Sequence, residues 1–187
     1  WLLSVSTDAL VRLLGGDPAM GRERMTQEEL RGLVATHDEL TEDERDLIDD
    51  VFAAGERELR EVMIPRTEVA FLPEDMPLFT AAEKVGNQPH SRYPVIGRNS
   101  DDVIGFVHVR DLLDPGLSGR SIRVGALARP VPRMPSTKRV IPTLTELRDS
   151  GHHLAIVVDE YGGTDGVVAM EDLVEELVGD IRDEYDA

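Results

Sequence analysis

Residues 92–113 read RYPVIGRNSDDVIGFVHVRDLL, and residues 153–174 read HLAIVVDEYGGTDGVVAMEDLV. The two stretches align without a gap at an offset of 61 residues. Each contains an apolar segment, a polar turn, a second apolar segment opened by glycine, and an Asp that leads a Leu-rich segment. The positions that are identical in both stretches are Gly105/Gly166, Val107/Val168, Asp111/Asp172 and Leu112/Leu173.

Internal repetition constrains a fold more than a single motif does, because one copy of such a unit cannot close its own core. We therefore expect the two copies to form a pseudo-symmetric pair with a cleft between them. The polar residues 99–102 and 161–164 predict a hairpin turn in each copy. Gly162 and Gly163 are expected to supply the positive φ angles that such turns need.

The composition excludes several classes of function. Hydrophobic residues make up 41% of the 187 residues but aromatic residues only 4%, so we expect a core of aliphatic side chains. The absence of cysteine excludes disulfides, thiolate metal sites and cysteine nucleophiles. A formal net charge of −17 repels nucleic acid and anionic lipid, so we expect no nucleic-acid partner.

The beginning of the chain is not expected to be a signal peptide. Residues 1–14 predict an amphipathic helix closed by Gly15 and Gly16, without the basic region of a signal peptide. No run approaches the about 20 apolar residues that span a bilayer. We expect the chain to be a piece of a larger protein.

Acidic helices are predicted before the repeats. Thr26 with Glu29, and Thr41 with Glu44, form the capping-box pattern that starts a helix. Carboxylates are frequent between Asp38 and Glu61, either as a solvated helix face or as a face that senses cations or docks a partner.

Each repeat is expected to have the order β-α-β-β-α. In the first, residues 67–72 predict an extended segment and Thr80 is expected to cap a helix that ends near Val85. Thr143 is expected to cap the equivalent helix of the second repeat. The predicted fold class is α+β, with tandem repeats as a pseudo-two-fold pair preceded by acidic α-helices. The predicted division is a membrane-proximal and acidic helical segment 1–57, a first repeat 58–120 and a second repeat 121–187.

This unit, with Gly-x-x-x-x-x-Asp after the third strand, resembles the cystathionine-β-synthase (CBS) domain, two of which form a Bateman module. The segments EVMIPRTEV, HSRYPVIG, GFVHVRDLL and HLAIVVDEYGGTDGVVAMEDLVEELVGDI resemble the CorC/CNNM, or hemolysin-C-like, family of magnesium transport and efflux proteins. The resemblance implies a homodimer formed through the CBS helices. It also implies a transmembrane domain in the same full-length protein, and a position on the cytoplasmic face of the plasma membrane.

The resemblance further implies that an adenine nucleotide, ATP or AMP with Mg²⁺, binds between the repeats. A carboxylate at Asp172 can accept hydrogen bonds from both ribose hydroxyls. Arg92 can bind phosphate, Tyr93 can offer an aromatic surface, and Ile64 and Val69 can sandwich a purine. No residue is predicted to be catalytic or to bind a metal directly. The expected nucleotide-binding residues are Ile64, Arg66, Thr67, Val69, Ser91, Arg92, Tyr93, Pro94, His153, Met170, Glu171 and Asp172.

Structural interpretations of the same residues stay open. Asp172 can be a plain helix N-cap, and Arg92 can be a surface ion-pair residue. Tyr93 and Pro94 can be packing residues at a strand edge.

One departure from the family pattern weakens the expected site. CBS nucleotide sites commonly carry Thr or Ser three residues before the Asp, where this chain has Ala169 and His108. One lost hydrogen bond costs about 0.5–1.5 kcal/mol of binding. Glu171 disfavours bare phosphate but tolerates phosphate bridged by Mg²⁺. A second site is conceivable at Asp111, with His108, Pro130 and Val131.

An enzyme is not expected, because the sequence offers neither a Ser-His-Asp arrangement nor a phosphate-binding glycine loop. The favoured function is a regulatory, nucleotide-binding module of a membrane protein that transports Mg²⁺ or another divalent cation. The alternative is a dimerisation scaffold with a degenerate nucleotide site. A third interpretation is direct Mg²⁺ sensing by the acidic helices.

Overall fold

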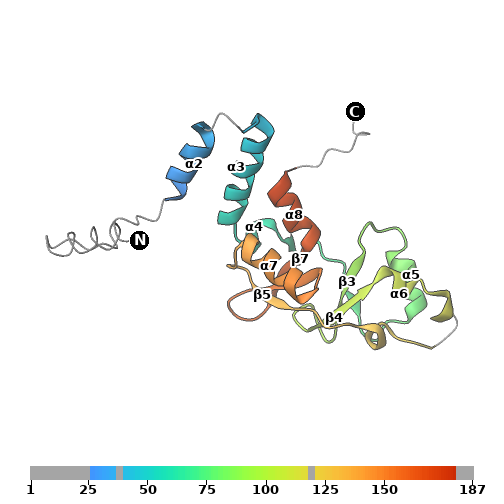
Figure 1. Cartoon of the computed structure of the whole chain (residues 1–187). Coiled ribbons are helices and arrows are strands. Elements are labelled where there is room, and N and C mark those ends of the chain that lie inside the picture. The colour runs from blue at the N-terminus through green and yellow to red at the C-terminus, as the bar shows by residue number, and fades with distance from the viewer. Residues whose placement is uncertain (1–25, 37–39, 118–120, 180–187) are drawn as a thin grey trace, which may run out of the picture. The chain divides into compact units, whose positions relative to one another are not determined.

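The structure is a computed structural model that describes residues 26–36, 40–117 and 121–179 (Figure 1). The helix expected over residues 1–14 lies outside the described residues. The described residues belong to two compact units that divide between Asp46 and Leu47. The division predicted after residues 57 and 120 stays a prediction.

Both capping boxes of the acidic helices are confirmed. Before α2 (Gln27–Thr36), the Thr26 N–H donates to Glu29 Oε2 at 2.8 Å, and the Glu29 N–H donates to Thr26 Oγ1 at 3.2 Å. Thr41 and Glu44 make the same exchange at 2.8 and 3.3 Å before α3 (Glu42–Glu56). The bond from the Thr41 backbone lowers the pKa of Glu44. The carboxylates of each first turn also meet the positive end of the helix dipole.

The first repeat has the expected β-α-β-β-α order. Its strands form a three-stranded sheet in the order β2-β3-β4, in which β2 and β3 are parallel and β3 and β4 antiparallel. The short helix α4 (Leu59–Val62) precedes it. The elements are β2 (Leu72–Pro73), α5 (Leu78–Val85), β3 (Arg92–Ile96), β4 (Val103–His108) and α6 (Val109–Leu112), followed by the 3-10 turn η1 (Pro115–Leu117).

The second repeat has the same order, so the expected α+β fold is confirmed. Its sheet has four strands in the order β1-β7-β6-β5, and β1 (Ile64–Pro65) comes from the segment that leads into the first repeat. The 3-10 turn η2 (Val124–Leu127) precedes it. The other elements are β5 (Arg133–Pro135), α7 (Val140–Ser150), β6 (Leu154–Val158), β7 (Thr164–Ala169) and α8 (Met170–Val178).

The leading segment of each repeat crosses the last strand of the other repeat. Ile64 pairs with Val167 in β7, and Arg129 pairs with Phe106 in β4. A Cβ atom at Gly166 would lie 2.3 Å from the Ile64 carbonyl oxygen, and one at Gly105 would lie 2.3 Å from the Arg129 carbonyl oxygen. The two repeated glycines are therefore required because a backbone passes directly over each of them.

The gapless alignment of the repeats is wrong by one residue in the first strand of each hairpin. Arg92 pairs with His108, and Leu154 pairs with Ala169. β3 and β6 are thus related by an offset of 62 residues, whereas β4 and β7 keep the offset of 61. The turn between β6 and β7 is one residue shorter than that between β3 and β4, so Arg92 corresponds to Leu154 rather than to His153.

Some local expectations are wrong. In the stretch expected to be extended, only β2 is a strand within the sheet, and a turn at 66–68 precedes it. The helix α5 starts at Leu78 and α7 at Val140, earlier than the expected caps Thr80 and Thr143.

Buried apolar side chains determine these earlier starts. Leu78 and Val140 are both buried and open their helices against the cores of the two repeats. Thr143 instead bonds inside its helix, to the Arg139 carbonyl at 2.8 Å. In the β6–β7 turn, Gly162 has the expected positive φ of 83°, but Gly163 does not.

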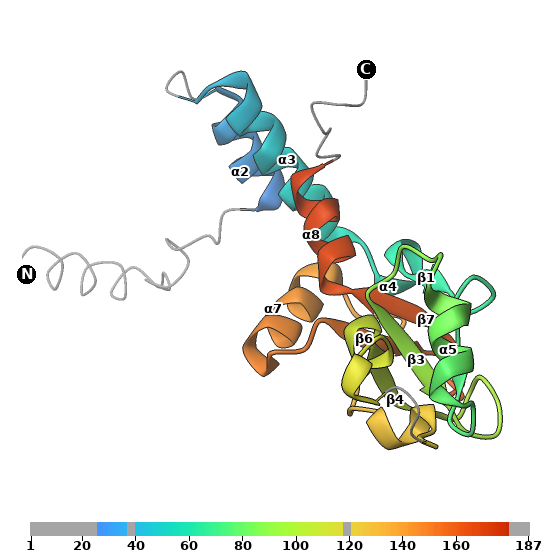
Figure 2. The same ribbon diagram turned by 90° about the vertical axis from the view of Figure 1, so that its right-hand side faces the viewer.

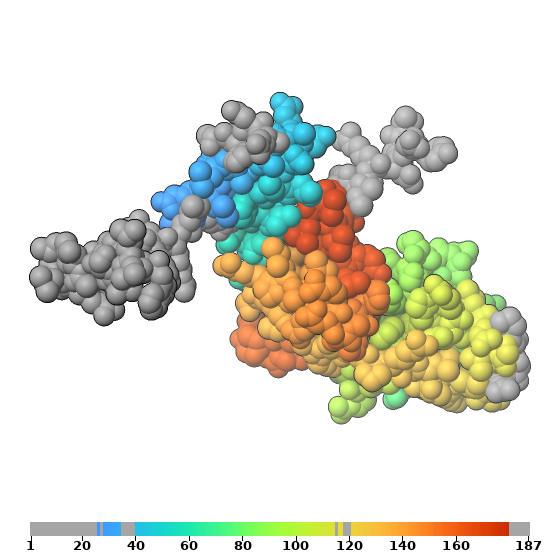
Figure 3. All heavy atoms as spheres, in the orientation of Figure 1, coloured from blue at the N-terminus to red at the C-terminus, as the bar shows by residue number. Residues whose placement is uncertain are grey.

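Three apolar clusters hold the second compact unit together. One lies between the sheet and helices of the first repeat and includes Tyr93 and Val107. A second cluster lies between the sheet and the helices of the second repeat and includes Leu173. The third draws Val103 from the first repeat and Ile156 from the second, and so packs the two repeats against each other. The repeats lie side by side in the space-filling view of Figure 3, whereas in Figure 2 the first repeat lies in front of the second.

Candidate functional site

A cleft of about 220 Å³ lies between the two repeats. This volume is just below the about 300–1,000 Å³ typical of ligand pockets, so the cleft suits a nucleoside better than a whole nucleoside triphosphate. The first repeat and its leading segment contribute Ile64, Glu68, Val69, Ala70, Pro89, His90, Ser91, Arg92, Tyr93 and Pro94. The second repeat contributes Leu154, Val167, Ala169, Glu171 and Asp172.

Eight of the twelve expected binding residues line this cleft. The other four lie elsewhere. Arg66 is exposed and forms an ion pair with Asp101 at 3.3 Å, and Thr67 lies in the turn after β1. Met170 lines a shallow hollow on α8 with Val174 and Glu175.

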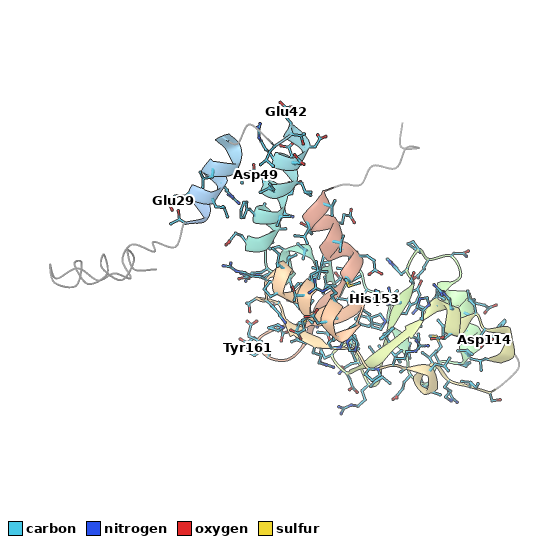
Figure 4. The ribbon with its side chains drawn as sticks, in the orientation of Figure 1. Glu29, Glu42, Asp49, Asp114, His153 and Tyr161 are labelled. Atoms are coloured by element: carbon cyan, nitrogen blue, oxygen red, sulfur yellow. The ribbon has the colours of Figure 1, made fainter. Side chains whose placement is uncertain are left out.

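His153 also lies outside the lining, although it is close to one lining residue. Its Nδ1 is 3.7 Å from Glu171 Oε1. Figure 4 shows His153 between α8 and the first repeat.

Several lining residues were missed by the sequence reasoning. Glu68 lies in the turn at 66–68 and Ala70 just after it, where part of an extended segment was expected, and Pro89 and His90 precede the strand that carries Arg92. Leu154 and Val167 read only as core residues in the sequence. The internal repeat was the available signal for Val167, because it predicts that the two copies pair. The strand of the second repeat that pairs with β1 carries Val167.

Asp172 is the third residue of α8, and its Oδ2 accepts a hydrogen bond from the Ala169 N–H at 3.2 Å. The plain N-cap interpretation is therefore wrong, because Ala169 occupies the N-cap position. Within the described residues, Oδ1 of Asp172 has no hydrogen-bond partner. This half-buried carboxylate thus offers one acceptor atom at the cleft and uses the other to fix its own orientation.

Arg92 joins the two walls of the cleft. Its Nη1 lies 3.1 Å from Glu171 Oε1, and its side chain is only 19% exposed. Among the described residues that line the cleft, Arg92 is the only Lys or Arg, beside the carboxylates of Glu68, Glu171 and Asp172. A bare phosphate meets one cation and three anions here, so the lining favours a ligand whose phosphates carry a counter-cation.

Tyr93 lines the cleft but is almost completely buried. Side chains alternate along a strand, so Arg92 and Pro94 face the second repeat while Tyr93, 1% exposed, belongs to the core of the first. Its hydroxyl has no hydrogen-bond partner among the described residues. Burial raises the pKa of Tyr93, and the backbone of His90 partly offsets that rise.

In the first repeat, Asp111 is the equivalent of Asp172, and its carboxylate is already paired with an arginine. Asp111 Oδ2 lies 2.7 Å from Arg129 Nη2, and Arg129 occupies the place that Ile64 holds in the cleft. His108 caps α6 through a bond from the Arg110 N–H to its Nδ1 at 3.1 Å. Pro130 follows Arg129 as an exposed residue, and Val131 packs in the cluster between the repeats. The carboxylate that a second ribose would need is thus bonded to an arginine.

In the part of the chain that the structure describes, no group of three or more His, Cys, Asp or Glu side chains is arranged to hold a metal ion. No helix within the described ranges is long and apolar enough to cross a membrane.

Comparisons with known proteins agree with this geometry. The CBS-domain family model matches residues 59–115. A UPF0053 protein of Mycobacterium tuberculosis is 39% identical over 169 residues, which are 88% of this chain and 38% of that protein. The magnesium and cobalt efflux protein CorC of Vibrio cholerae is 38% identical over 151 residues, 80% of this chain and 52% of CorC. The chain spans about half the length, or less, of these relatives.

Solved structures extend the match to both repeats. The CBS domain of a bacterial CNNM/CorC family Mg²⁺ transporter superposes with a TM-score of 0.78 at 32% identity, over 84% of this chain and 99% of that domain. A complex of such a domain with ATP gives 0.70 at 33% identity, over 74% and 99%. The two repeats and the cleft between them define a tandem CBS-domain pair. The chain belongs to the CNNM/CorC family of CBS-domain proteins.

Proposed function

We propose that this chain is the regulatory module of a membrane protein that transports Mg²⁺ or another divalent cation, and that it binds an adenine nucleotide between its repeats. It acts as a binding module rather than as an enzyme. The observation that carries the proposal is the cleft itself, in which Asp172 of one repeat and Arg92 of the other line one cavity. A similar domain has been solved in complex with ATP.

The geometry supports a defined orientation of the nucleotide. The apolar side chains of Ile64 and Val69 suit a purine, and the free Oδ1 of Asp172 suits a ribose hydroxyl. The phosphates then lie toward Arg92, which must give up part of its ion pair with Glu171 to bind them. Because three carboxylates line the cleft, ATP with Mg²⁺ is favoured over free ATP.

The helix α8 is suited to carry a signal away from the cleft. Its first turn contains Asp172, whereas Glu176 in its second turn forms an ion pair with Arg57, just after α3. A small shift of α8 on nucleotide binding would therefore reach α3 and the acidic helices, and through them a membrane domain on the cytoplasmic side. Val174 and Val178, 40% and 46% exposed, provide apolar surface on α8 for a homodimer.

Two observations favour the alternative, a dimerisation scaffold with a degenerate cleft. Ala169 lacks the hydroxyl that could hold ribose or phosphate, and Glu171 already neutralises Arg92. Under this alternative the ion pair only fastens the two repeats together, and no nucleotide stabilises the fold.

Thermal unfolding separates the two functions. ATP, ADP and AMP are each added with and without Mg²⁺, and Mg²⁺ is also added alone. At about 100 times its Kd a nucleotide stabilises by about 2.7 kcal/mol, a rise of roughly 5–10 °C in Tm for a domain of this size. Asp172→Ala should abolish this rise, while Glu175→Ala, an exposed change on the same helix, should retain it. No shift with any nucleotide at millimolar concentration supports the scaffold, and a shift with Mg²⁺ alone supports direct sensing by the acidic helices.

A further inference from the structure

Four basic side chains come from one end of the β3–β4 hairpin and the segments beside it: Arg92, His108, Arg110 and Arg129, here called the arginine cluster. Their positions follow from the backbone. Arg92 and His108 are paired residues of β3 and β4, so their side chains leave the same face of the sheet. Arg129 is held beside them by its backbone bonds with Phe106, at 2.8 and 2.9 Å. Arg110 follows His108 in the first turn of α6.

The charges of this cluster are close enough to affect one another. Burial lowers the pKa of His108, and Arg110, Arg92 and Arg129 all lower it further, against the opposite effect of Asp111. Three guanidinium groups therefore act on one imidazole, and each of them lowers its pKa. This concentration of positive charge stands out in a chain whose net charge is −17.

The opposing carboxylates do not neutralise the cluster. Arg92 pairs with Glu171 and Arg129 pairs with Asp111. Arg110 is exposed, and within the described residues no carboxylate forms an ion pair with it. The positive charge of Arg110 is therefore not compensated by an ion pair, whereas Arg92 and Arg129 each have one carboxylate partner.

The pseudo-symmetry of the fold shows that the cluster belongs to one repeat alone. The counterparts of Arg92, His108, Arg110 and Arg129 are Leu154, Ala169, Glu171 and Ile64. The cleft is thus apolar and acidic where the corresponding surface of the first repeat is basic. Since Arg129 bonds Asp111, the carboxylate that a ribose would need, this surface is unsuited to a nucleoside but suited to an anion.

We infer that the arginine cluster is a phosphate subsite, in which Arg110 and Arg129 bind the phosphate chain of a nucleotide whose nucleoside occupies the cleft between the repeats. The inference rests on the proposed function. Arg92 lines the cleft and also belongs to the arginine cluster, and so provides the point at which the phosphate chain passes from one to the other. The subsite makes the affinity of the two repeats for a nucleotide increase with its number of phosphates. It also limits each chain to one bound nucleotide.

The test compares adenosine, AMP and ATP, each with Mg²⁺, by calorimetric titration of the wild-type chain and of Arg110→Gln and Arg129→Gln. We expect each substitution to reduce the gain in affinity of ATP over adenosine about tenfold, the effect of one lost charge-assisted hydrogen bond. Adenosine itself should bind within about twofold of the wild type. Arg148→Gln, an exposed arginine of α7 that is ion-paired with Asp149, is the matched control and should change neither affinity.

Two outcomes would overturn the inference or separate it from the proposed function. If both variants keep the full gain of ATP over adenosine, the phosphates do not use the arginine cluster. If the wild type binds no nucleotide at all, the proposed function fails, and sodium tripolyphosphate then tests the cluster alone. Tripolyphosphate binding that Arg110→Gln and Arg129→Gln weaken supports the phosphate subsite, and absence of tripolyphosphate binding contradicts it.

Discussion

Arg92 of the first repeat and Glu171 of the second form an ion pair of 3.1 Å across the cleft that separates the repeats. The pair places a carboxylate where a phosphate of a bound nucleotide would otherwise meet the guanidinium. Under the proposed function, Glu171 therefore competes with the phosphates for Arg92. Its Oε1 also lies 3.7 Å from His153, so the same atom is shared by two basic groups.

Removing this competitor should strengthen nucleotide binding. In Glu171→Gln, Arg92 keeps its position but loses its charged partner, so we expect ATP without Mg²⁺ to bind about two- to fivefold more tightly. The increase in ATP affinity that Mg²⁺ causes should therefore become smaller in this variant. Calorimetric titration with and without Mg²⁺ checks this, with Glu175→Gln on the same helix as the control. An unchanged dependence on Mg²⁺ would show that Glu171 does not compete for the phosphates.

Restoring the hydroxyl at residue 169 should improve both binding and stability. Ala169 is the N-cap residue of α8 and lines the cleft. A Thr there is a better N-cap, worth about 1 kcal/mol of stability, and adds a hydrogen bond to the ligand worth about 0.5–1.5 kcal/mol. Urea unfolding and nucleotide titration of Ala169→Thr measure the two effects. Ala169→Val has nearly the same shape without the hydroxyl, and equal binding by the two variants would contradict the prediction.

The two repeated glycines should not tolerate a methyl group. A Cβ at Gly105 or Gly166 would meet a carbonyl oxygen at 2.3 Å. Because the contact is with backbone, Gly105→Ala and Gly166→Ala should each destabilise the fold by about 2–4 kcal/mol. Gly32→Ala in α2, where nothing lies within 4 Å, should instead stabilise its helix by about 0.5–1 kcal/mol. Denaturant unfolding checks all three, and unchanged stability of both repeat variants would contradict the crossing of backbones.

His108 should make stability depend on pH. Its pKa is lowered in the folded state, chiefly by burial and then by Arg110 and Arg92. The unfolded chain therefore binds the proton more readily, and stability is lost as pH falls through the ordinary histidine value of 6.5 toward the lowered one. His108→Asn retains a side-chain acceptor for the Arg110 N–H and should lose this part of the slope. Urea unfolding between pH 8 and about pH 5 makes the comparison, and identical slopes would show that His108 does not titrate on unfolding.

The order of elements could be predicted from the sequence because each copy of the repeat carries its own local signals. The polar turns between β3 and β4 and between β6 and β7, predicted at 99–102 and 161–164 and found at 97–102 and 159–163, fix the hairpins together with the apolar strands around them. The capping boxes at Thr26 and Thr41 depend on residues only three apart, and they were confirmed.

What the sequence did not reveal depends on distant contacts. The pairing of Ile64 with Val167 joins residues that are far apart in the chain, so no local pattern announces it. The early starts of α5 and α7 follow from burial of Leu78 and Val140 in cores that only the complete fold creates.

For the candidate site, the strand alternation could have separated Arg92, which pairs with Glu171 across the cleft, from Tyr93, which lines the cleft as a buried residue of the first core. The position of Arg129 beside Asp111 could not have been predicted. It depends on the pairing of Arg129 with Phe106, where the leading segment of the second repeat meets the last strand of the first.

The most direct test of the account is calorimetric titration of ATP with Mg²⁺ into the wild-type chain and into Asp172→Ala. The account predicts saturable binding of one nucleotide per chain to the wild type. It predicts no measurable binding to Asp172→Ala, with the variant's fold retained in circular dichroism. Equal binding by the two proteins, or no binding by the wild type at millimolar ATP, would contradict the claim that the cleft between the repeats is a nucleotide site.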